Sequence, residues 1–340
     1  DVRRRRAQQA LDGRRAVASG ARDDDDLIAD DEARQDADAE LAAGASPAHL
    51  RIVLTAREVA AYSSRDGWVA GLAARWAGVP LILRYRHIEV DYPNRLLSAA
   101  AFSWLPHHVI TTSERIRHRL ICELGVPHNR IDTVPTGIAL DGFQLRQSTL
   151  RGELGLPDTT PVVGMISVLR SWKGHGFFLK AARQILDRRY NIHFVIAGDG
   201  PQKDAIARQV RVLDLVKHVH LLGHRDDVAN VLAGLDLLVL PSTGHEGIPQ
   251  IILQAHALAV PIVASQVGGI PEVVRDGMTG TLVEPGDSGK LATAIEGVLQ
   301  DPAHAKTMAL KGRDRVRASF TLDHMADHIE LICRRYLGDS

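Results

Sequence analysis

The sequence predicts an α/β protein with two doubly wound, parallel-sheet domains, of which the first is incomplete. The chain has 340 residues, and because a domain usually holds about 100 to 200 residues, two domains are expected. From about residue 48 onwards, short β-branched runs alternate with segments of helical length, which is the order typical of parallel sheets. This series stops at the turn Pro135-Thr136-Gly137 and then begins again, which indicates the change of domain.

Residues 1–47 differ from the rest of the chain. They contain runs of four arginines (residues 3–6) and four aspartates (residues 23–26), and no aromatic residue precedes Tyr62. A segment of this composition cannot bury enough apolar surface to fold, so we expect disorder or loose helix. Because the chain begins with Asp1 instead of Met, we interpret it as a fragment or as having a front end translated in the wrong frame.

The predicted first domain covers residues 48–140. Its strand candidates are residues 50–54, 80–83, 108–111 and 131–134, and its helix candidates are residues 67–76, 93–104 and 114–124. Ser113 is a suitable N-cap for the last of these helices, and Gly125 is a suitable residue to end it.

The predicted second domain covers residues 141–318 and is followed by a C-terminal helix at residues 319–340. Its strand candidates are residues 162–169, 193–197, 219–222, 237–240, 262–264 and 281–283. The helix candidates are residues 176–189, 202–213, 227–233, 249–258, 270–275 and 288–300, with a helical tail over 302–336. Ligands of such sheets bind beyond the carboxyl ends of the strands, so the turns after these strands are the candidate site.

Composition excludes several classes of function. The 41 basic and 41 acidic residues balance, which argues against a dedicated nucleic-acid binder. The longest apolar runs, such as residues 235–240, are far shorter than the roughly 20 residues of a membrane-spanning helix, so we expect a soluble, cytoplasmic protein. Cys122 and Cys333 are too few for a disulfide framework or a four-ligand zinc site.

The most informative segment follows the strand candidate at 237–240 and reads Pro-Ser-Thr-Gly-His-Glu-Gly-Ile-Pro-Gln (241–250). Gly247 lets the backbone approach a ligand, Pro249 suits a first helical turn, and the free N–H groups of the helix start favour a phosphate. Glu246 could accept hydrogen bonds from sugar hydroxyls, or it could only complement the dipole of the following helix.

Three further turns follow strands. Arg170 and Lys173 stand within one turn and suit a diphosphate, although two solvated surface cations would look the same. The turn Ala-Gly-Asp-Gly-Pro (197–201) is either a phosphate or ribose turn or a structural turn in which Asp199 caps the next helix. At residues 223–227, Arg225 lies where polar backbone could meet a base, but a capped helix start fits this segment better.

These turns, taken in order, resemble the donor-binding domain of glycosyltransferase family 4, whose members are retaining nucleotide-sugar transferases of two-Rossmann (GT-B) architecture. The resemblance runs from about Tyr62 to the C-terminus and is strongest over residues 162–285. It is carried by Val-Leu-Arg-Ser-Trp-Lys-Gly-His (168–175), Ala-Gly-Asp-Gly-Pro (197–201), Leu-Gly-His-Arg-Asp-Asp-Val (222–228), Glu-Gly-Ile-Pro-Gln (246–250) and Val-Gly-Gly-Ile-Pro-Glu-Val-Val-Arg-Asp-Gly (267–277). Bacterial members that build lipopolysaccharide and other envelope glycans are the most similar.

The resemblance implies roles for individual residues. Arg170 and Lys173 would contact the donor diphosphate, and Glu246 the donor sugar. The second glutamate of the family's E-x7-E motif falls on Gln254, which departs from the pattern, although an amide can still bind ribose hydroxyls. His87 stands at a strand end where many relatives carry an active-site histidine, but a solvent-facing histidine is the alternative.

The remaining donor-binding residues implied by the resemblance are Gly198, Asp199, Gly200, Arg225, Gly247, Ile248 and Pro249. The family's first strand and Gly-rich loop are missing from residues 1–46. Asp36-Ala37-Asp38 imitates a metal-binding motif of other transferases, but its position makes it accidental, and we expect neither a metal nor a cofactor.

The sequence therefore predicts a glycosyltransferase of the hexosyltransferase type. It would move a sugar from a nucleotide-diphosphate sugar to a hydroxyl of a glycan or lipid-linked acceptor in the synthesis of bacterial envelope polysaccharide. Its partners would be the nucleotide sugar and the acceptor, with weak peripheral association at the inner face of the cytoplasmic membrane and no nucleic acid. The alternatives are an inactive nucleotide-sugar-binding remnant and an enzyme that isomerises or hydrolyses the nucleotide sugar.

Overall fold

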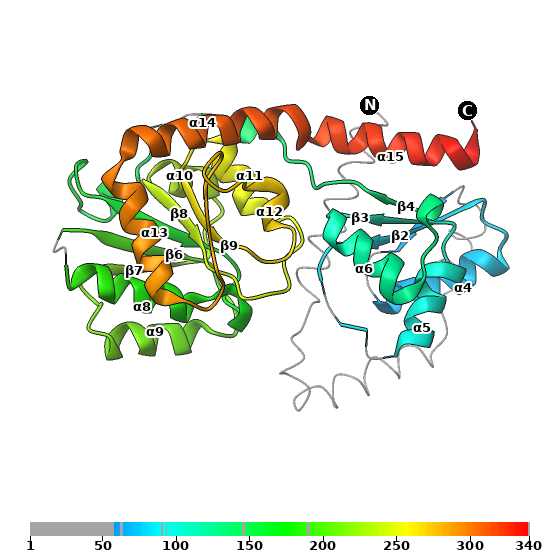
Figure 1. Ribbon diagram of the computed structural model, residues 1–340, viewed down its shortest axis with the longest axis horizontal. Helices are drawn as coiled ribbons and strands as arrows, with labels where there is room; N and C mark the ends of the chain where they lie inside the picture. The colour runs from blue at the N-terminus through cyan, green and yellow to red at the C-terminus, as the bar shows by residue number, and fades with distance from the viewer. Residues whose placement is uncertain are drawn as a thin grey trace.

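The computed structural model describes residues 58–61, 64–89, 91–92, 94–144, 147–188 and 191–338. The predicted strand at 50–54, the interpretation of residues 1–47 and Asp36-Ala37-Asp38 lie outside these residues. The described chain forms two lobes, each with a parallel sheet flanked by helices (Figure 1). This architecture confirms the predicted fold class of two parallel-sheet α/β domains.

The sheet of the first lobe has four parallel strands in the order β1-β2-β3-β4. These are β1 (Glu58–Ala61), β2 (Leu81–Arg86), β3 (His108–Thr111) and β4 (Ile131–Thr133). The helices are α4 (Ser64–Trp76), α5 (Arg95–Ala99), which continues as a π-helix over Ala100–Trp104, and α6 (Glu114–Leu124). Both predicted ends of α6 are confirmed, because the Ser113 side chain accepts the Ile116 N–H and Gly125 has a φ of 67°.

The second lobe has six parallel strands in the order β10-β9-β8-β5-β6-β7. They are β5 (Val162–Ile166), β6 (His193–Ala197), β7 (Val219–Gly223), β8 (Leu237–Leu240), β9 (Ile262–Ser265) and β10 (Thr281–Val283). All six predicted strands are present, and the strand order reverses direction between β5 and β8. In doubly wound sheets such a reversal marks the ligand crevice at the carboxyl ends of the strands.

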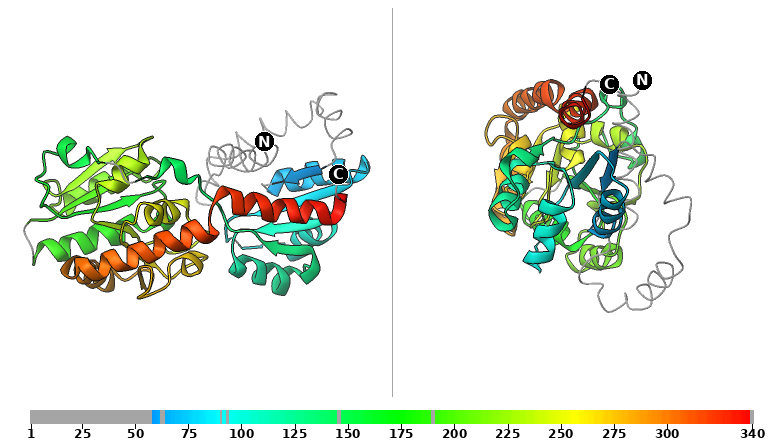
Figure 2. Two further views of the ribbon diagram at one scale, coloured as in Figure 1. Left: turned by 90° about the horizontal axis from the view of Figure 1, so that it is seen from above. Right: turned by 90° about the vertical axis from the view of Figure 1, so that its right-hand side faces the viewer.

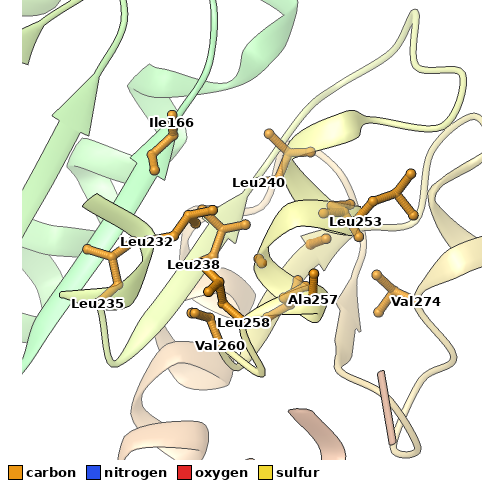
Figure 3. Close-up of a cluster of buried hydrophobic side chains, with 14 of the residues drawn as sticks. Ile166, Leu232, Leu235, Leu238, Leu240, Leu253, Ala257, Leu258, Val260 and Val274 are labelled. Atoms are coloured by element: carbon orange, nitrogen blue, oxygen red, sulfur yellow. The ribbon is translucent and has the colours of Figure 1, made fainter. Parts of the chain in front are cut away.

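Helices cover both faces of this second sheet. They are α7 (Leu150–Glu153), α8 (His175–Leu186), α9 (Lys203–Val212), α10 (Val228–Ala233), α11 (Gln250–Ala257), α12 (Ile270–Val273) and α13 (Ser288–Gln300). Each face has its own apolar cluster, and Figure 3 shows part of one, in which Leu238 and Leu240 of β8 pack near Leu253 and Leu258. A sheet buried on both faces holds its strand ends rigidly, which suits the support of a site.

The predicted helical tail is two helices, α14 (Pro302–Ser319) and α15 (Leu322–Leu337). It breaks because the backbone of Ile138, between the lobes, binds there: its N–H donates to Phe320 O at 3.0 Å and its carbonyl accepts the Leu322 N–H at 3.2 Å. Beyond the break, α15 lies on the first lobe (Figure 2) and packs Met325 and Ile329 into that lobe's apolar cluster. The C-terminal helix therefore completes the core of the first lobe.

Candidate functional site

Four turns join at the carboxyl edge of the second sheet, as the strand order predicts. The turn at Gly198 packs on the segment after β5, where a Cβ on Gly198 would lie 1.9 Å from Ser167 O and the Leu169 N–H donates to Asp199 O at 2.9 Å. Gly198 in turn donates to Gly223 O at 2.7 Å, and the Thr243 N–H donates to Trp172 O at 2.7 Å. The segments 167–174, 198–201, 223–227 and 241–250 are thus joined by backbone contacts at one edge of the sheet.

A largely buried ion pair joins two of these segments. Lys173 Nζ donates to Glu246 Oε1 at 2.6 Å, and their side chains are only 18% and 6% exposed. Ser242 Oγ donates to the same carboxylate oxygen at 2.6 Å. The Glu246 carboxylate is therefore held by two side chains instead of capping α11, and Lys173 is not a solvated surface cation.

Arg170 and Trp172 form the outer part of the same turn. The Arg170 guanidinium lies 5.1 Å from the centre of the Trp172 ring, and His245 meets that ring edge-on at 5.3 Å. The His245 backbone is left-handed, with a φ of 57°, and its Nδ1 lies 3.0 Å from Glu89 O of the first lobe. The loop before α11 thus reaches from the second lobe to the first.

Asp199 and Arg225 are both held by neighbouring groups. The Gly200 N–H, followed by the Lys203 ammonium, lowers the pKa of the exposed Asp199 carboxyl. The hydrogen bonds that Arg225 donates to Asp227 and, with a smaller effect, to Glu153 raise the pKa of Arg225 above its usual value. The helix start expected at this turn is present, with Asp227 at the N-cap of α10, but the Asp227 side chain makes no cap hydrogen bond and binds the side chains of Arg225 and Asn230 instead.

The residues Gly247, Ile248 and Pro249 are buried, and Gln254 is half-buried in the second turn of α11. Gly247 touches the first lobe, since a Cβ there would lie 1.9 Å from His87 O. The His87 ring itself stacks on Tyr85 at 5.8 Å and is half-buried, which does not fit a freely solvated histidine. The structure thus brings the predicted acceptor-side and donor-side residues together across the lobes.

Three polar residues near the site were not singled out from the sequence. Ser242 binds Glu246, and Glu272 of α12 contacts the first lobe through its carboxylate. His175 lies beneath the turn of Arg170, with Nε2 3.2 Å from Ser167 Oγ, and burial lowers its pKa to about 4, so it is neutral at pH 7. All three fall inside motifs that the sequence marked, but no spacing rule shows which partners they bind.

Two features, a metal-binding cluster and a membrane-spanning helix, are absent from the residues that the structure describes. No group of three or more His, Cys, Asp or Glu side chains within those ranges is arranged to hold a metal ion. None of the helices described is both long and apolar enough to cross a membrane.

Both lobes match family models of glycosyltransferases. A model of glycosyl transferases group 1 matches residues 160–301, and a model of Glycosyltransferase Family 4 matches residues 58–141. An Escherichia coli UDP-Gal:alpha-D-GlcNAc-diphosphoundecaprenol alpha-1,3-galactosyltransferase is 28% identical over 283 residues, which cover 79% of this chain and 73% of the relative. An alpha-D-kanosaminyltransferase from Streptomyces kanamyceticus is 26% identical over 283 residues, covering 77% and 72%.

The structure of HepE from Anabaena in complex with UDP and glucose is similar to this fold. It superimposes with a TM-score of 0.78 at 23% sequence identity and covers 84% of this chain and 80% of its own. At this identity the likeness establishes the arrangement of the two lobes.

Proposed function

Because the chain belongs to glycosyltransferase family 4, we propose that it moves a sugar, with retention at the anomeric carbon, from a nucleotide-diphosphate sugar to an acceptor hydroxyl. The observation that carries the proposal is the buried pair of Lys173 and Glu246, held by Ser242 beside Arg170 at the carboxyl edge of the second sheet. A cation and a carboxylate in this position suit the two chemically different parts of a nucleotide sugar.

The roles of the site residues follow from their charges. Lys173 and Arg170 would bind the diphosphate and stabilise the negative charge that develops on it as the bond to the sugar breaks. The start of α11, after Gly247 and Pro249, would add backbone N–H groups and the positive end of the helix dipole. Glu246 would then orient the sugar through its hydroxyls, and Gln254 would hold the ribose.

The turns at Gly198, Asp199, Gly200 and Arg225 would complete the donor site. His87 would lie at the acceptor side, close to the sugar. These cations and helix ends supply the positive charge at the leaving group, so we propose that transfer requires no metal ion.

The acceptor would be a hydroxyl of a glycan or of a lipid-linked sugar in bacterial envelope synthesis, as the name of the Escherichia coli relative suggests by analogy. The first lobe supports contact with a lipid surface. Trp76 and Trp104 are 80% and 59% exposed, and they lie near each other because Arg75 binds Trp104 O. Leu97, on α5, which leads into the turn that carries Trp104, is 55% exposed as well. We propose that this apolar patch gives weak peripheral association at the inner face of the cytoplasmic membrane.

A thermal-shift titration of the whole chain against UDP-, GDP-, ADP- and dTDP-sugars, with EDTA present, tests the donor site. A ligand that binds only the native state raises the melting temperature, so one nucleotide class is expected to give a saturable shift. Lys173→Met should abolish the shift. Arg188→Met is the matched control, because Arg188 also forms an ion pair in the second lobe, with Glu296 at 3.0 Å, but at the end of α8 away from the site.

A cooperative melt that no nucleotide sugar moves would contradict the proposal. Once a donor is known, chromatography of the products with and without candidate acceptors separates transfer from hydrolysis or isomerisation. Binding without any turnover would instead indicate a nucleotide-sugar-binding protein.

A further inference from the structure

A carboxylate of the second lobe caps a helix of the first lobe. Glu272, on α12, accepts the Glu114 N–H through Oε2 at 2.9 Å and the Arg115 N–H through Oε1 at 3.0 Å. Both N–H groups belong to the first turn of α6. The carboxylate therefore binds two main-chain donors across the boundary between the lobes.

This contact completes the start of α6. The first four N–H groups of a helix have no partner within it. Here the N–H of Ile116 is bound by Ser113 Oγ at 3.2 Å, and the regular helix bonds begin with the Arg117 N–H, which donates to Ser113 O at 3.1 Å. The N–H groups of Glu114 and Arg115 are bound by Glu272, so closing the lobes satisfies them with a negative charge at the positive end of the helix dipole.

The segment just before Glu272 is joined by short backbone contacts to the loop at Glu246 and Gly247, here called the donor loop. Gly268, with a φ of 54°, packs so that a Cβ would lie 2.0 Å from Glu246 O, and a Cβ on Gly269 would lie 2.6 Å from Gly247 O. The Gly269 N–H donates to Glu246 O at 3.2 Å. From the other side, Arg315 of α14 donates to the main-chain oxygen of Glu272 at 2.7 Å. The position of Glu272 is thus coupled to that of the Glu246–Gly247 loop.

We propose that Glu272 is the latch that holds the two lobes closed, and that it acts as a positioning residue for transfer by tying the donor loop to α6. The role in transfer rests on the proposed function, whereas the latch itself does not. If the lobes separate, the carboxylate and the two N–H groups of α6 all return to water. Closure excludes the water that would otherwise hydrolyse the donor.

Small-angle X-ray scattering of the full chain tests the latch without any substrate. Glu272→Gln is isosteric, but it has one acceptor oxygen for two N–H groups. We expect the ratio of closed to open molecules to fall roughly tenfold with the loss of one hydrogen bond to a charged acceptor, seen as a larger radius of gyration. Glu296→Gln, a half-buried glutamate bound within the second lobe by Arg188, should scatter like the wild type.

A second variant removes a donor instead of the acceptor. Glu114→Pro deletes one N–H at the first position of α6, where proline is well tolerated, and Ser113 already has the extended backbone that precedes proline (φ −144°, ψ 150°). Glu114→Pro should therefore open the lobes. Glu114→Ala keeps the N–H and should leave the lobes closed. Wild-type scattering from well-folded Glu272→Gln and Glu114→Pro would overturn the latch.

Kinetics test the positioning role separately. With the donor found in the thermal-shift panel, Glu272→Gln should bind UDP or the matching free nucleotide as the wild type does. It should lose roughly tenfold in the kcat of transfer and release more hydrolysed sugar per transfer. If Glu272→Gln opens the lobes but keeps the kcat of the wild type, the positioning role alone is overturned. If the wild type binds no nucleotide, the proposed function is overturned, but the scattering result for the latch still stands.

Discussion

Lys173 and Glu246 lie 73 positions apart in the chain, yet their charged atoms are 2.6 Å apart in a buried setting. One follows β5 and the other follows β8, and these two strands are neighbours at the point where the strand order reverses. The topology of the sheet therefore creates the pair. In the proposed function, the cation would face the diphosphate and the anion would face the sugar.

The first prediction concerns the energy of this pair. Lys173→Met leaves the buried Glu246 carboxylate with Ser242 but without its cation and should lower the free energy of unfolding by about 3 kcal/mol, whereas Glu246→Gln leaves the partly exposed Lys173 without its carboxylate and should cost less. The double variant removes both charges and should cost much less than the sum. Urea unfolding of the four proteins checks this, and additive losses would show that the pair is not coupled.

The second prediction concerns acid stability. Burial, with a smaller contribution from Arg315, lowers the pKa of His256 to about 3, whereas an unfolded histidine titrates near 6.5. Between these values the unfolded chain binds a proton that the folded chain does not. Stability should therefore fall as the pH drops from about 6.5 towards 3, by up to about 1.4 kcal/mol per pH unit from this residue.

His256→Met removes this contribution. Urea unfolding at pH 7.5 and pH 5.0 should show that the variant loses less stability on acidification than the wild type does. Equal losses in the two proteins would mean that His256 is protonated in the folded state or that its environment differs from the one described.

The third prediction uses the contact between α11 and α14. A Cβ on Gly312 would lie 2.1 Å from His256 Nδ1, so Gly312→Ala should destabilise the protein by about 1 to 3 kcal/mol through overpacking. His256→Ala in the same chain makes room for the methyl group and should recover part of this loss. Gly297→Ala in α13, where a Cβ meets no atom within 4 Å, should be neutral or stabilising.

The fourth prediction concerns the exposed tryptophans. Trp76→Ser combined with Trp104→Ser should weaken co-sedimentation of the chain with vesicles of phosphatidylglycerol and phosphatidylethanolamine, and should leave its melting temperature nearly unchanged. Val212→Ser is the control, because Val212 is 83% exposed but lies on α9 of the other lobe. If the wild type does not bind such vesicles, the proposed peripheral association is wrong.

Much of the fold follows from periodicity, and the exceptions have physical reasons. The strand β1, Glu-Val-Ala-Ala, was not predicted because alanine and glutamate have low strand propensity, but pairing with β2 overrides that preference. The strand at 162–169 was predicted too long, since β5 ends at Ile166 and Leu169 turns to bind Asp199 O. The tail was predicted as helical over 302–336, with a C-terminal helix from residue 319, but nothing in its sequence reveals that Ile138 binds its backbone at Phe320.

The candidate site was found from the sequence in outline but not in detail. Turns after strands and the family motifs indicated Arg170, Lys173 and Glu246. They could not show that Glu246 binds Lys173 and Ser242, because such partners come from different strands. Glu272 was part of a quoted motif, but its contact with α6 depends on how two lobes meet, which no local pattern encodes.

The packing of α15 has a consequence for how the chain is made. The apolar face of the first sheet, with Leu81, Leu83 and Ile110, is covered by Met325 and Ile329, which are synthesised after the strands of both sheets. Domains usually fold in order as they leave the ribosome, but here the core of the first lobe is complete only once α15 has been made, whereas the second lobe has its own core without α15. Until then the apolar face of the first sheet stays uncovered, so a chain that lacks α15 is expected to expose that face.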